Sequence, residues 1–115
     1  MLSFTASLKI YVAVEPCDMR KSFEGLSALT TTALNQDVRN GALFVFSNER
    51  RNRLKILYWD GTGLWVLAKR LERGTYSWPR GEEKSIELRP EALAMLTDGI
   101  ELHGAKMRPW YDRGE

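Results

Sequence analysis

The densest positive charge of the chain lies between Glu49 and Arg80, where eight basic residues accompany three acidic ones. The whole chain of 115 residues has a formal net charge of only +2, so the basic residues are concentrated in this stretch. Lysine and arginine bind phosphate, arginine through a planar fork of donors. A basic stripe with aromatic residues on a sheet is typical of a nucleic-acid surface. The alternative is a solvated strand face whose cations pair with nearby carboxylates.

The candidate phosphate contacts come from this stretch and from one earlier site. The loop Glu49–Arg53 carries three arginines and is our first choice for contacts to a nucleic-acid backbone. Arg20 and Lys21 are expected in the first turn of a helix, where the helix dipole disfavours cations unless an anion binds there. Neutralisation by Asp18 and Glu24 is the alternative. The complete set is Arg20, Lys21, Arg50, Arg51, Arg53, Lys55, Lys69, Arg70 and Arg73.

Three tryptophans, Trp59, Trp65 and Trp78, fall within the same basic stretch. A sheet that holds all three must bury some of them in the core. An exposed tryptophan would instead anchor a partner protein or stack on bases. We therefore treat all three as candidate partner-binding residues.

The sequence offers no catalytic constellation. Gly61-Thr62-Gly63 lacks the further glycine and the following helix of a nucleotide-binding loop, so we interpret it as a hairpin turn. His103 lies beyond the last expected element, and Cys17 has no partners for covalent catalysis. A single cysteine and a single histidine also argue against a zinc site. We therefore predict a non-enzymatic protein without metal or cofactor.

Apolar runs at residues 8–14, 43–46, 54–59, 64–71 and 85–88 predict the strands that position these residues. Asp60-Gly61 is a strong hairpin signal. A helix is expected from an N-cap at Asp18 to about Leu34, and a second from Pro90 to an αL cap at Gly99. The predicted fold is α+β, an antiparallel β-meander of about five strands with both helices packed against it.

The length is that of one domain, expected over residues 1–102 and followed by a C-terminal tail at 103–115. Trp110 and Tyr111 in the tail are further residues that could dock on a partner. No apolar run approaches the roughly 20 residues that span a bilayer, and the first residues do not resemble a secretory signal. We expect a soluble cytoplasmic protein without membrane contact.

Several blocks of the sequence resemble, in order, the TnpB-type accessory protein of the sixty-six family of bacterial insertion sequences, which is not the RNA-guided nuclease of the same name. The blocks are Pro16–Leu26, Leu43–Phe46, Arg53–Gly61, Lys69–Gly74 and Trp78-Pro79. The resemblance implies a small protein encoded in a mobile element beside a larger transposase and needed for efficient transposition. It carries over no catalytic residue.

Two hypotheses follow. In the first, the basic residues bind element-end DNA through a basic sheet face while the tryptophan-bearing sheet meets the transposase. In the second, the protein is an adaptor of the transposase complex without direct nucleic-acid contact. A metal-dependent nuclease is a remote third reading. The sequence leaves the oligomeric state open.

Overall fold

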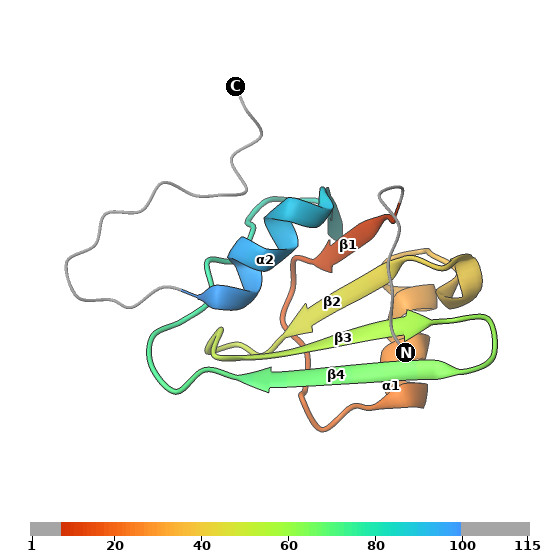
Figure 1. The fold of residues 1–115 in the computed structure, drawn as a ribbon, viewed down its shortest axis with the longest axis horizontal. Helices are drawn as coiled ribbons and strands as arrows, with labels where there is room; N and C mark the ends of the chain where they lie inside the picture. The colour runs from red at the N-terminus through yellow and green to blue at the C-terminus, as the bar shows by residue number, and fades with distance from the viewer. Residues whose placement is uncertain (1–7, 100–115) are drawn as a thin grey trace.

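The computed structural model describes residues 8–99 and shows an α+β fold built on a five-stranded sheet (Figure 1). The strand order is β4-β3-β2-β1-β5. In chain order the elements are β1 Ile10–Ala13, α1 Phe23–Thr32, the short 3-10 helix η1 Val38–Asn40, β2 Leu43–Ser47, β3 Arg53–Trp59, β4 Leu64–Arg70, β5 Ser85–Leu88 and α2 Pro90–Asp98. The predicted tail at 103–115 lies outside the described residues.

The predicted meander is confirmed for β2, β3 and β4, which are consecutive antiparallel neighbours. It is wrong at β1, which runs parallel to β2 with Ile10 opposite Leu43. The chain passes through α1 between these two strands, and such a crossover is what lets neighbouring strands run parallel. β5 then pairs antiparallel with the other side of β1. The sheet is therefore mixed.

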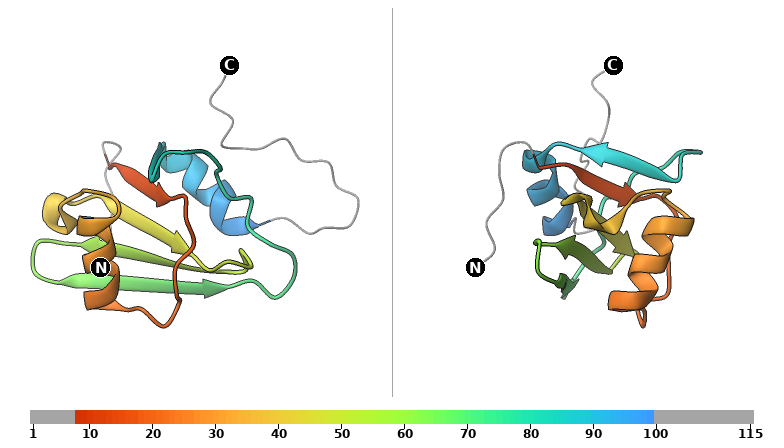
Figure 2. Two further views of the ribbon diagram at one scale, coloured as in Figure 1. Left: turned by 180° about the vertical axis from the view of Figure 1, so that it is seen from behind. Right: turned by 90° about the vertical axis from the view of Figure 1, so that its right-hand side faces the viewer.

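The two helices cover opposite faces of the sheet (Figure 2). On the face of α1, Leu26 packs with Phe44 and Leu57. On the face of α2, Leu96 belongs to a core cluster with Ile56. All five residues of β2 are buried because this strand has core on both sides, which explains its unbroken apolar run.

Helix α1 begins later than predicted. It starts at Phe23 after Ser22, and Asp18 is not its N-cap. Asp18 instead closes a separate turn, in which its carboxylate accepts the backbone N–H of Arg20 at 2.8 Å and its carbonyl accepts that of Lys21 at 3.1 Å. Arg20 and Lys21 therefore precede the helix and do not lie in its first turn. The helix ends at Thr32, two residues before the predicted Leu34.

Helix α2 starts at Pro90, as predicted from the preference of proline for the first helical turn. Gly99 follows the last helical residue with φ 76° and ψ −179°. This positive φ favours glycine, but the extended ψ differs from the expected αL cap. Neither helix within residues 8–99 has the length and apolar character needed to cross a bilayer.

Candidate nucleic-acid interface

The pairing of β3 with β4 determines which cations share a face of the sheet. Arg53 is directly opposite Arg70, and Lys55 is opposite Ala68. Side chains alternate along each strand, so these residues lie on the same face as Leu57, which packs into the core beneath α1. Lys69 lies on the other face of β4. The prediction of a single basic sheet face is therefore wrong, because the cations are divided between two faces.

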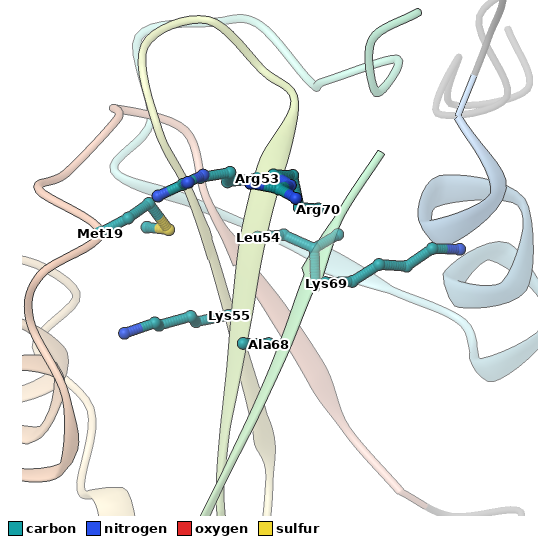
Figure 3. Close-up of a pocket in the computed structure, with 7 residues that line it drawn as sticks. All are labelled: Met19, Arg53, Leu54, Lys55, Ala68, Lys69 and Arg70. Atoms are coloured by element: carbon teal, nitrogen blue, oxygen red, sulfur yellow. The ribbon is translucent and has the colours of Figure 1, made fainter. Parts of the chain in front are cut away.

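Arg53, Lys55 and Arg70 form what we call the β3–β4 basic cluster. Together with Met19, Leu54, Ala68 and Lys69 they line a pocket of about 360 Å³ beside the chain that leads into α1 (Figure 3). Arg53 and Arg70 are exposed, and within residues 8–99 neither side chain makes a hydrogen bond or an ion pair with a carboxylate.

The pairing of Arg53 with Arg70 is electrostatically unfavourable in the absence of an anion. Like charges directly opposite on neighbouring strands destabilise a sheet. The neighbouring ladder bond, from the Leu71 N–H to the Asn52 carbonyl at 2.9 Å, places Arg53 and Arg70 at a non-hydrogen-bonded position, where side chains are closest. A phosphate between the two guanidinium groups would turn this repulsion into attraction.

Lys55 and Lys21 place further positive charge beside the two arginines. The Lys55 ammonium donates to the Lys21 carbonyl oxygen at 2.8 Å and so joins β3 to the segment before α1. The Lys21 residue is exposed. Both lysines are close enough to Cys17 to lower the pKa of its thiol, although burial outweighs them and raises that pKa overall. Cys17 is thus a packed thiol and not an activated one.

Lys69 has a structural partner on the opposite face. Its ammonium donates to the Thr97 carbonyl oxygen at 2.8 Å, in the last turn of α2, and Figure 3 shows the side chain directed toward that helix. A cation at a helix C-terminus is favoured by the helix dipole. Lys69 therefore joins β4 to α2.

Arg51 is embedded beside the core. Its guanidinium lies 5.2 Å from the centre of the Trp78 ring and donates to Ser47 Oγ at 2.5 Å and to the Val14 carbonyl oxygen at 3.0 Å. Burial, with a smaller contribution from nearby Arg80, lowers the pKa of Arg51. The backbone of Arg51 has φ 57°, in the left-handed region. These contacts give Arg51 a structural role in the turn between β2 and β3.

Other cations gather at the same end of the sheet. The β2–β3 turn lies beside the segment after β4, because the Tyr76 N–H donates to the Arg51 carbonyl at 2.7 Å. Arg50 and Arg80 line a second pocket of about 180 Å³ there, and Arg73 is exposed in the neighbouring loop. The predicted set omits Arg80, although this residue ends the basic stretch two residues after Trp78.

The charge of Arg20 is neutralised by a neighbouring carboxylate, that of Asp18, which is the alternative expectation for this site. Its guanidinium contacts the Asp18 carboxylate at 2.6 Å, and both side chains are well exposed. The hydrogen bonds from the Arg20 side chain are the main reason that the pKa of Asp18 falls to about 2. Arg20 is therefore paired and distinct from the β3–β4 basic cluster.

The three tryptophans have different surroundings. Trp78 is 5% exposed and its Nε1–H donates to the Ala13 carbonyl at 2.8 Å, so it belongs to the core. Trp59 is half-buried, with the Arg39 guanidinium 5.0 Å from its ring centre. Trp65 is 41% exposed, and its Nε1–H donates to Asp60 Oδ2 at 2.8 Å. Trp65 is thus the most accessible of the three.

Within residues 8–99, no three side chains of the His, Cys, Asp or Glu types come together in a way that could hold a metal ion. His103 lies outside the described residues. The chemistry that the described residues support is the binding of an anion by the exposed cations of β3 and β4.

Comparisons with known proteins place the chain in a family. Residues 8–107 match the family described as IS66 Orf2 like protein. The uncharacterized protein y4jC of Sinorhizobium fredii is 35% identical over 109 residues, which cover 95% of this chain and 93% of the relative. The uncharacterized protein y4hO of the same organism is 33% identical over 101 residues, 88% of each chain. No solved structure matches significantly. The chain therefore belongs to the IS66 Orf2 like family, whose members are accessory proteins in the transposition of bacterial insertion sequences.

Proposed function

We propose that this protein assists transposition by binding the DNA at the ends of its element through the β3–β4 basic cluster. One observation carries the proposal. Arg53 and Arg70 are opposite each other on neighbouring strands, both are exposed, and neither has a carboxylate partner within residues 8–99. A phosphate backbone would supply the missing negative charge.

The surroundings of the cluster favour contacts to the DNA backbone over contacts to bases. The pocket is lined by four cations, the three of the cluster and Lys69, and by Met19, Leu54 and Ala68. Among residues 8–99 its lining contains no aromatic side chain on which a base could stack. Contacts of cations to phosphate carry no sequence information. We infer that this surface binds duplex DNA without strong sequence preference and that recognition of the element ends belongs to the transposase.

The second candidate function is an adaptor of the transposase complex that makes no direct nucleic-acid contact. It is favoured by two exposed apolar side chains on the α2 face of β4, Trp65 and Leu67, which are 41% and 38% exposed. Exposed tryptophan is enriched among the residues that dominate protein–protein binding. In this function the cations would serve solubility or meet an acidic patch of the transposase.

A pull-down distinguishes the two functions. The purified protein is offered labelled element-end DNA and the transposase, separately and together. DNA binding predicts retention of the DNA alone, and its loss as salt is raised. Retention of transposase that persists after nuclease treatment and in high salt, with no DNA retained alone, would establish the adaptor and overturn the DNA proposal.

A further inference from the structure

The outer edge of β4 is the longest free edge of the sheet. β4 has seven residues and ends the sheet on one side, whereas β5, which ends it on the other, has four. Within residues 8–99 no strand pairs with the outer edge of β4. A long strand with unpaired N–H and C=O groups is a template for pairing with another strand.

The β3–β4 ladder determines which backbone groups are available at this edge. The Asp60 N–H donates to the Gly63 carbonyl at 3.1 Å, and the Leu71 N–H donates to the Asn52 carbonyl at 2.9 Å. Hydrogen-bonded and non-hydrogen-bonded positions alternate between these two ends. The odd-numbered residues of β4 therefore bond to β3. The outward backbone groups belong to Leu64, Val66, Ala68 and Arg70.

We propose that two copies of this chain associate through antiparallel pairing of their β4 strands, with Leu67 of one copy opposite Leu67 of the other. Leu67 is the middle residue of β4, so this register pairs the whole strand. It also places the outward groups of Val66 opposite those of Ala68 of the second copy, as an antiparallel ladder requires. The sheet would then continue through both copies.

The distribution of charge along β4 favours this arrangement. The strand is apolar at its first end, with Leu64 and Trp65, and basic at its last, with Lys69 and Arg70. Antiparallel pairing about Leu67 places each cation opposite an apolar or aromatic residue. Parallel pairing, or a register shifted toward the basic end, would place cation opposite cation, which destabilises a sheet.

In this register Trp65 lies opposite Lys69 of the second copy, a pair that brings no like charges together. Asp60 accepts hydrogen bonds from the Thr62 N–H and from Trp65 Nε1–H, and these bonds lower the pKa of Asp60, so the indole has a fixed negative charge beside it. The Lys69 ammonium is already held by the Thr97 carbonyl, so its apolar stem is the part left to cover the indole. Trp65 and Leu67 would both lose exposed surface.

The test is the mass of the full chain in solution, measured by sedimentation equilibrium over a wide range of protein concentration. The proposal predicts a species of twice the 13.2 kDa of one chain. Leu67→Lys and Leu67→Glu should each weaken self-association about tenfold or more, since each places like charges face to face on the two-fold axis. An equimolar mixture of the two variants should restore the dimer, because opposite charges then meet.

Met95→Lys is the matched control, because Met95 is also exposed but lies on α2. It should associate like the unchanged protein, and circular dichroism should show that all variants fold. A monomer at every concentration would overturn the proposal and leave the edge to another partner, such as the transposase. Failure of the mixed variants to associate would overturn the pairing about Leu67, as would an equal effect of Met95→Lys.

Discussion

Arg51 and Arg53 are separated by one residue, yet their guanidinium groups have opposite surroundings. Arg51 lies over the Trp78 ring and donates to the Val14 carbonyl and the Ser47 hydroxyl. Arg53 is exposed and lies opposite Arg70 on the neighbouring strand. The protein supplies two hydrogen-bond acceptors and an aromatic ring to the Arg51 guanidinium, whereas within residues 8–99 it supplies no acceptor to that of Arg53. The basic stretch therefore contains both residues that stabilise the fold and residues that remain available to a ligand.

Trp78→Ala gives the largest expected effect, because it removes the ring on which Arg51 lies. Trp78 is 5% exposed, and truncation of a buried tryptophan costs about 3–5 kcal/mol in the free energy of unfolding. Urea denaturation followed by circular dichroism measures this loss. Trp78→Phe keeps a ring but loses the hydrogen bond to the Ala13 carbonyl. It should therefore lower the free energy of unfolding by more than about 1 kcal/mol, but by less than the alanine variant does. Equal stability of the alanine variant and the unchanged protein would show that Trp78 is not part of the core.

Arg51→Ala compared with Arg53→Ala tests the difference between the two regions directly. Hydrogen bonds from a charged donor are stabilising, so loss of the two made by Arg51 should lower the free energy of unfolding by about 2 kcal/mol. Arg53→Ala should stay within about 0.5 kcal/mol of the unchanged protein. The same denaturation experiment measures both variants. A larger loss at Arg53 than at Arg51 would reverse our assignment of roles.

Arg53→Ala combined with Arg70→Ala should act on DNA and spare the fold. We expect affinity for duplex DNA to fall about tenfold, the change that corresponds to about 1.4 kcal/mol, with little change in stability. Fluorescence anisotropy with labelled DNA measures the affinity. Lys9→Ala combined with Arg89→Ala removes the same charge from exposed positions outside the basic stretch and should have a smaller effect. An equal loss of DNA affinity in both double variants would show that binding depends on net charge alone.

The smallest expected effect concerns Asp18 and its partner Arg20. Arg20 is exposed like Arg53, but its guanidinium has hydrogen-bond acceptors in the protein, as that of Arg51 does. Arg20 lowers the pKa of Asp18 from 3.8 to about 2. The folded pKa is lower than the unfolded one, so the contribution to stability is complete above about pH 3.8 and disappears as the pH falls through about 2. An NMR titration of the Asp18 carboxyl carbon should show this midpoint, and Arg20→Ala should raise it toward 3.8. An unchanged midpoint in Arg20→Ala would show that the pair does not persist in solution.

The strands could be predicted from sequence because apolar runs and turn residues are local signals. Asp60-Gly61 marks the β3–β4 hairpin, and that hairpin is present. The direction of β1 could not be read in the same way, because parallel pairing with β2 depends on how α1 packs over the sheet. The predicted start of α1 is wrong because Asp18 forms a local turn with Arg20, and such side-chain-to-backbone bonding of aspartate competes with helix capping.

The site could be predicted in part. Charge counting located the basic stretch, and the apolar runs placed Lys55, Lys69 and Arg70 on strands. The sequence alone could not show which face of the sheet Lys69 and Arg70 each occupy, because their faces depend on the register with β3. Nor could it show that Arg51 lies on Trp78, since that contact joins residues far apart in the chain.

The salt dependence of DNA binding tests the central claim most directly. The logarithm of the association constant is measured against the logarithm of salt concentration for the unchanged protein and for the Arg53→Ala, Arg70→Ala double variant. Each lost phosphate contact should reduce the magnitude of the slope by about 0.9, so the loss of two contacts in the double variant should reduce it by about 1.8. Arg51→Ala, which retains both exposed arginines, should keep the slope of the unchanged protein. Identical slopes for the double variant and the unchanged protein, or no salt-sensitive binding, would contradict our account.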